Sequence, residues 1–122
     1  MFQRVGAAAY KANLHNIMQL CNLLGNPQKD LQCIHVAGTN GKGSVTHIVA
    51  SVLIHAGYTV GIYTSPHYLT FRERIKIGNT FIEEDFITDF ISKHLLLFKK
   101  VDASFFEITT AMMFEYKKKK KV

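Results

Sequence analysis

The chain has 122 residues, of which 48% are hydrophobic and 20% charged, so it can fold around one core and is at most one domain. No run of 18 uncharged apolar residues is present, which argues against a membrane span, and the first residues lack the hydrophobic core of a signal peptide, so we expect a cytoplasmic protein. Five of the fifteen basic residues stand together at 117–121. The net charge of +6 is therefore concentrated at one end and does not indicate the spread basic surface of a nucleic-acid-binding protein.

The first half of the chain predicts a helix, a strand, a second helix and a second strand. Alanine-rich, periodically apolar residues predict a helix over 7–24, which a Gly-Asn-Pro turn ends. Residues 32–37 are typical of a strand, residues 43–56 of a helix with an apolar stripe, and residues 59–64 of another strand. A strand, a helix and a strand in this order form a βαβ unit. We therefore expect a parallel sheet in a three-layer α/β domain.

The second half adds a predicted hairpin and two helices. Residues 74–82 carry a Gly-Asn pair between two short runs, the length of a two-residue hairpin. Acidic residues open a helix predicted over 83–98, and Ser104 opens a last helix with apolar residues at helical spacing. Cys21 and Cys33 have no histidine at zinc-ligand spacing, so we interpret both as buried thiols.

The most informative segment is HVAGTNGKGS at 35–44, between a predicted strand and a predicted helix. Its glycines let backbone N–H groups converge, and these groups with the helix N-terminus make an anion site. Lys42 can reach β- and γ-phosphate oxygens, and Ser44 or Thr39 offers a hydroxyl to phosphate or magnesium. The strict P-loop pattern is not met, since its first glycine would stand at Val36. An ordinary glycine-rich turn would not explain a lysine at the positive end of a helix, so the segment predicts nucleotide binding.

This loop resembles the signature loop of the folylpolyglutamate and dihydrofolate synthases, a branch of the Mur ligase superfamily. Four more segments resemble that family in the same order, LGNPQ at 24–28, AGYTVGIYTSPH at 56–67, RERI at 72–75 and FFE-x-TTA at 105–111. The resemblance covers residues 6–116. It implies that 1–122 is the N-terminal part of a P-loop-type ATP-binding domain, the central type of the Mur ligases, with the C-terminal glutamate-ligase domain absent.

The resemblance implies an ATP-dependent ligase that adds L-glutamate to dihydropteroate or folate through an acyl phosphate, with Mg²⁺ spanning the phosphate oxygens. The residues that match the ATP-phosphate site are Thr39, Asn40, Gly41, Lys42, Gly43 and Ser44, with Lys42 catalytic. Ser65 matches a magnesium ligand, although a serine before proline can also cap a turn.

The FFE segment matches the pterin and folate pocket. Phe105 and Phe106 could stack on a pterin ring, and Glu107 could pair with its N–H groups. Ser104-x-x-Glu107 is also a capping box, and paired phenylalanines at a helix start are often core. Arg72 and Arg74 could meet the anionic tail of a folate or form a solvated pair.

The family pattern continues past the sequence, into a strand with an acidic magnesium ligand and a second domain. We therefore expect these 122 residues to lack ligase activity alone, while the full-length ligase would be a monomer acting on small molecules. Two alternatives remain, a non-catalytic nucleotide-binding remnant and another Mur-type P-loop ligase.

Overall fold

A computed structural model describes residues 13–122 of the chain. Helices and a small sheet alternate along it, so the predicted α/β class is confirmed. In chain order the elements are α1 (His15–Leu23), the 3-10 turn η2 (Pro27–Asp30), α2 (Lys42–His55), β1 (Gly61–Tyr63), the 3-10 turn η3 (Phe71–Arg74), β2 (Ile75–Ile77), β3 (Thr80–Phe81), α3 (Glu84–Val101) and α4 (Phe105–Lys119). The first helix was predicted over 7–24, but residues 13 and 14 are not helical and α1 begins at His15. The predicted start at residue 7 lies outside the described residues.

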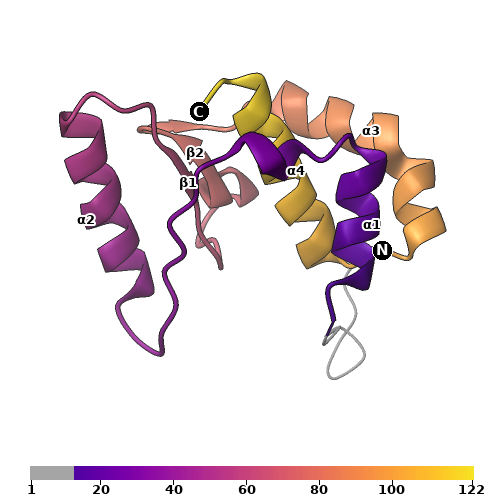
Figure 1. Ribbon diagram of the computed structural model, residues 1–122, viewed down its shortest axis with the longest axis horizontal. Coiled ribbons are helices and arrows are strands. Elements are labelled where there is room, and N and C mark those ends of the chain that lie inside the picture. The colour runs from indigo at the N-terminus through magenta and orange to yellow at the C-terminus, as the bar shows by residue number, and fades with distance from the viewer. Residues whose placement is uncertain (1–12) are drawn as a thin grey trace.

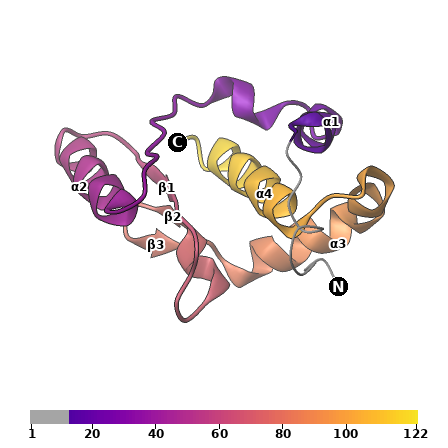
Figure 2. The same cartoon turned by 90° about the horizontal axis from the view of Figure 1, so that it is seen from below.

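The strands lie between α2 on one side and the group α1, α3 and α4 on the other (Figures 1 and 2). β1 contacts α2, while α4 contacts α1, α3 and η2. The hydroxyl of Tyr63, at the end of β1, lies 3.1 Å from that of Thr109 on α4. This contact connects the sheet to the helical group.

The sheet is antiparallel, so the predicted parallel sheet is wrong. Its three strands lie in the order β1-β2-β3, and both pairs are antiparallel. Within the described part of the chain, residues 32–37 form no strand. A strand needs a neighbour whose N–H and C=O groups can pair with its own, and β1 has found that neighbour in β2. The hairpin at Gly78 is confirmed, with Gly78 at a φ of +57° that favours glycine.

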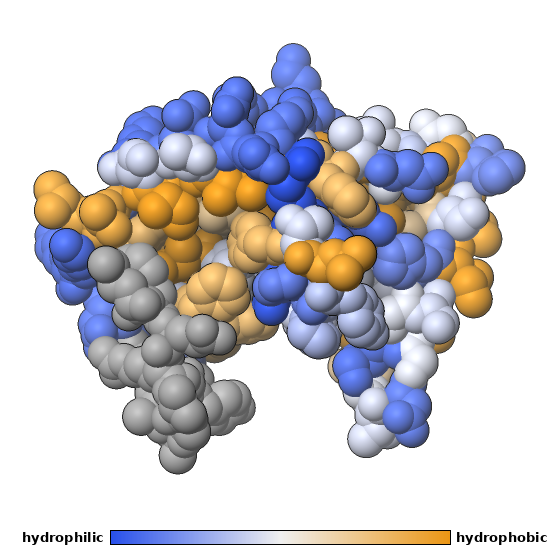
Figure 3. All heavy atoms as spheres, turned by 180° about the vertical axis from the view of Figure 1, so that it is seen from behind, coloured by the Kyte–Doolittle hydropathy of each residue, from blue (hydrophilic) through white to orange (hydrophobic). Residues whose placement is uncertain are grey.

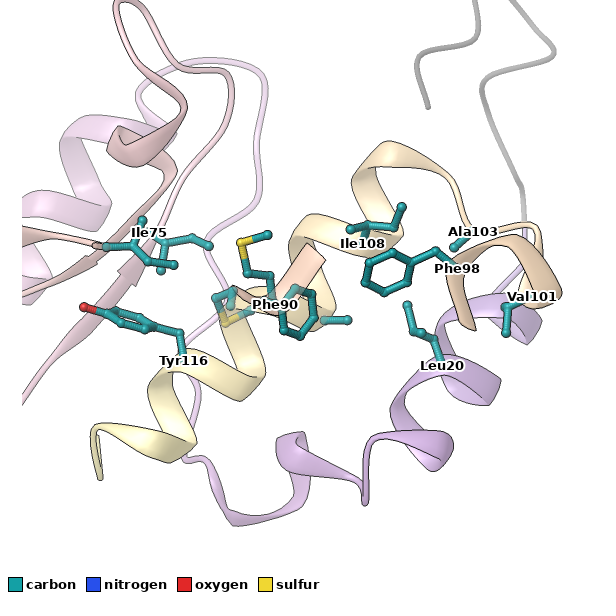
Figure 4. Packing of buried hydrophobic residues seen from close by; sticks show 12 residues of the cluster. Leu20, Ile75, Phe90, Phe98, Val101, Ala103, Ile108 and Tyr116 are labelled. Carbon is teal, nitrogen blue, oxygen red and sulfur yellow. The ribbon is translucent and has the colours of Figure 1, made fainter. Parts of the chain in front are cut away.

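The core lies around α4, which the chain buries on several faces. Figure 4 shows Phe90 and Phe98 of α3, Ile108 and Tyr116 of α4 and Leu20 of α1 directed into it, with Ile75 of β2 at its edge. Cys21 is buried as expected, at 3% exposure. Cys33 is exposed, contrary to prediction, because residues 32–37 do not enter a sheet.

The predicted apolar stripe of α2 is largely at the surface. Val45, Ile48 and Val52 are 47%, 64% and 63% exposed, and Ala50 is the buried residue of this helix. Hydrophobic side chains also reach the surface elsewhere on the molecule, as the rear view shows (Figure 3). Within residues 13–122, no helix combines the length and the apolarity that a membrane crossing requires.

Candidate functional site

A pocket of about 310 Å³ lies at the N-terminal end of α2. Residues 39–43 of the predicted phosphate loop form one wall, the turn 64–66 and Tyr68 contribute to another, and His47 of α2 also lines it. The structure thus brings together two motifs predicted separately, the glycine-lysine loop and the turn that contains Ser65. Of the predicted phosphate-binding residues, Ser44 does not line this pocket.

The start of α2 leaves backbone donors available at this pocket. Gly41 is the N-cap residue, with a left-handed φ of +74°, a conformation that glycine adopts without strain. No side chain caps the helix. Because the first N–H groups of a helix have no partner within it, those at the start of α2 can bind an anion, and the helix dipole favours one there.

The ammonium of Lys42 is directed back over its own loop. Its Nζ donates to the carbonyl oxygens of Gly38, at 2.5 Å, and Thr39, at 3.3 Å. These carbonyls offset the unfavourable placement of a cation at the positive end of a helix. Lys42 is exposed, so its ammonium can exchange these carbonyls for oxygens of a bound anion.

Ser65 lines the same pocket as Lys42 and is exposed. A serine hydroxyl is a hard oxygen ligand of the kind Mg²⁺ accepts. Among residues 13–122 no three His, Cys, Asp or Glu side chains gather at a possible metal site. Ser65 would thus offer one oxygen ligand to a magnesium ion, whose other ligands would be phosphate oxygens and water, as is common for Mg²⁺.

Glu73 shapes the loop that carries Tyr68. Its carboxylate accepts the N–H groups of Tyr68, Leu69 and Thr70, at 3.0, 2.8 and 2.8 Å. These backbone hydrogen bonds hold the pKa of Glu73 below its ordinary value. Sequence reasoning missed this role, although Thr70-x-x-Glu73 is a capping-box pattern that could have indicated it.

Arg74 lies in an aromatic cluster and has a side-chain partner. Its Nε–H donates to Nδ1 of His67, at 2.8 Å, and its guanidinium lies 5.4 Å from the centre of the Phe105 ring. Phe71 contacts both His67 and Phe105 edge to face. Arg72 instead donates to the carbonyl of Ile82. The two arginines of the RERI segment therefore have different surroundings.

The three predicted substrate residues at the start of α4 differ in exposure. Phe105 and Phe106 are 36% and 59% exposed, and Glu107 is buried at 7%. The carboxylate of Glu107 accepts the N–H of Ser104 at 2.7 Å, and Ser104 Oγ accepts the N–H of Glu107 at 3.3 Å. The capping box that the sequence left open is therefore present, and none of the three residues lines the pocket at α2.

No model of a protein family matches the chain. The chain is 39% identical over 112 residues to a dihydrofolate synthase/folylpolyglutamate synthase of Bacillus subtilis, a match that covers 87% of this chain and 26% of that protein. Thus the chain spans about a quarter of the length of that curated relative.

Solved structures of folylpolyglutamate synthases have the same fold as this chain over the matched residues. The chain matches the crystal structure of folylpolyglutamate synthase from Thermotoga maritima with a TM-score of 0.86 and 40% identity, over 93% of this chain and 28% of that one. It matches an FPGS-AMPPCP-folate complex with a TM-score of 0.85 and 33% identity, over 99% of this chain and 30% of that one. The second structure was thus determined with an ATP analogue and folate present.

Proposed function

We propose that this chain, which belongs by sequence and fold to the folylpolyglutamate synthase/dihydrofolate synthase family, is the nucleotide-binding part of an ATP-dependent ligase. The ligase adds L-glutamate to dihydropteroate or folate. One observation carries the proposal. The uncapped start of α2, Lys42 and Ser65 meet at one pocket. An anion-binding helix start, a cation and a hard hydroxyl oxygen are the groups that a magnesium-bound phosphate chain requires.

In this proposal the residues of the chain bind and orient the phosphates. The N–H groups at the start of α2 bind phosphate oxygens. The ammonium of Lys42 exchanges its hydrogen bonds to the carbonyls of Gly38 and Thr39 for hydrogen bonds to these phosphate oxygens. Ser65 would be the ligand through which the chain holds Mg²⁺, and the ion would neutralise charge on the phosphate oxygens. The reaction class is phosphoryl transfer from ATP to the substrate carboxylate, which gives an acyl phosphate and releases ADP. The amine of L-glutamate then attacks the acyl carbon, and an amide forms as phosphate leaves.

We propose Phe105 and Phe106 as the pterin-facing residues, since both rings are partly exposed at the start of α4. Glu107 would contribute by fixing that helix start, because its carboxylate is engaged with the N–H of Ser104. Arg74, which lies over the Phe105 ring, has donors suited to a carboxylate in the same place.

A Lys42→Ala variant tests the nucleotide site. Charge-assisted contacts of this kind contribute about 1.5–3 kcal/mol, so we expect at least a roughly tenfold loss of ATP affinity by calorimetric titration. Lys93→Ala, on the exposed surface of α3, is the matched control and should bind ATP as the parent chain does. Equal ATP affinity for the Lys42 and Lys93 variants would show that the loop has only a structural role.

ADP release with ATP, magnesium, glutamate and dihydropteroate or folate tests the ligase step. We expect the chain of 122 residues alone to bind ATP without glutamate-dependent ADP release, because it corresponds to about a quarter of the relative it matches. Glutamate-dependent release that Lys42→Ala abolishes would contradict this expectation.

A further inference from the structure

Two side chains, His47 of the pocket lining and Lys76, lie outside the segments to which the sequence assigned a binding role. His47 is on α2 and lines the pocket. Lys76 is the middle residue of β2, in the sheet that lies next to α2 (Figure 2). The ammonium Nζ of Lys76 lies 3.1 Å from Nε2 of the His47 ring. The fold thus brings a second lysine, distant in sequence from the phosphate loop, to a residue of the pocket wall.

The hydrogen bonds of His47 define its tautomer. Nδ1 lies 2.7 Å from the carbonyl oxygen of Gly43, which can only accept, so Nδ1 carries the hydrogen. A lysine ammonium can only donate, so Nε2 accepts from Lys76. The neutral ring therefore connects a backbone carbonyl of the phosphate loop to the ammonium of Lys76, and it fixes the position of that ammonium.

The charge of Lys76 is not balanced by a carboxylate. The ion pairs found among residues 13–122 do not include Lys76, whose other neighbour is the face of the Phe81 ring at 5.8 Å. The residues that line the pocket include no aspartate or glutamate. The pocket is therefore lined by Lys42 and a helix N-terminus, and Lys76 contacts it through His47. This positive charge without a negative side chain in the lining favours an anion with more than one charge.

We propose that Lys76 is a second cationic contact for the phosphate chain bound in this pocket, and that His47 is the positioning residue that holds its ammonium there. The inference rests on the proposed function, since it names further residues of the same nucleotide site. An ammonium has three hydrogens, so Lys76 can keep its bond to His47 and donate another to a phosphate oxygen. Lys42 then approaches the phosphates from the loop and Lys76 from the sheet.

Titration of the chain with inorganic tripolyphosphate, and separately with ATP, tests the inference. We expect Lys76→Met to weaken tripolyphosphate binding roughly three- to tenfold, as the loss of one partly exposed charged contact does. Lys93→Met, on α3, should leave it unchanged. His47→Leu should weaken binding similarly, and His47→Gln, whose side-chain oxygen can accept from Lys76, should restore most of the affinity.

The double variant separates positioning from a merely structural role. If His47 acts through Lys76, His47→Leu should have little further effect once Lys76→Met is present. Additive losses, or a Lys76→Met chain that binds tripolyphosphate as well as Lys93→Met does, would overturn the inference. Binding that depends on Lys42 but not on Lys76 would overturn the inference and leave the proposed function standing. A parent chain that binds neither ATP nor tripolyphosphate would overturn both.

Discussion

Lys117 is the most perturbed lysine of the C-terminal helix, and its replacement should stabilise the protein. The side chain is only 7% exposed, and burial lowers its pKa to about 8, partly opposed by Cys33. Its stem packs against Gly61 of β1, where an added Cβ would lie 2.6 Å from Lys117 Cε. The buried environment of Lys117 therefore suits the apolar methylene groups of its side chain better than its charged ammonium.

The shift in the pKa of Lys117 gives the size and sign of the effect. A fall from the ordinary 10.5 to about 8 corresponds to at most about 3 kcal/mol that the charged group costs the folded state. Below pH 8 both states carry the charge and the full cost applies. Between pH 8 and 10.5 the folded state releases its proton first, so stability rises with pH, and above 10.5 the cost is absent.

Urea denaturation of Lys117→Met from pH 7 to pH 10 measures this effect, since methionine keeps an unbranched apolar side chain without the charge. At pH 7 we expect the variant to be more stable by up to about 3 kcal/mol, or roughly 10 °C in Tm. The rise in stability above pH 8 should disappear. Lys119→Met, an exposed lysine of the same helix, should keep the rise. A Lys117→Met chain that is less stable than the parent, or that keeps the rise with pH, would refute the reasoning.

Three other predictions concern single contacts. Hydrogen bonds from Lys120 and then Tyr116 lower the pKa of Glu83 to about 2. Glu83→Gln should therefore be less stable than the parent above pH 4.5, by less than about 1 kcal/mol because the Glu83–Lys120 pair is half exposed, and the two should converge as the pH falls toward 2. Acid titration followed by circular dichroism measures this difference. Ser104→Ala should cost about 1 kcal/mol in urea denaturation through loss of the capping box, and Ser104→Thr should retain most of it. Ser65→Ala should weaken ATP binding severalfold in the presence of magnesium and leave magnesium-free binding unchanged, and an equal loss in both titrations would contradict a role as a ligand.

Structural features that depend on residues close together in the chain could be predicted from the sequence. The glycine-lysine loop before α2, the hairpin at Gly78 and the capping box at Ser104 each depend on residues a few positions apart, whose side chains and allowed φ values act on their own backbone. The same holds for the acidic first turn of α3. The hairpin and the acidic first turn are present as predicted, and the capping box, which the sequence left as an alternative to substrate contact, is formed.

Long-range pairing and burial were decided by the tertiary structure. The apolar residues of 32–37 predict a strand, but a strand exists only where another segment offers its edge, and β1 pairs with β2 instead. The stripe at Val45, Ile48 and Val52 has the period of a buried face and is exposed, while Lys117, within a lysine run, is buried. His47 and Lys76 meet only because β2 lies beside α2. A local pattern states what a segment can bury or pair with, and only the packing of distant segments supplies the partner.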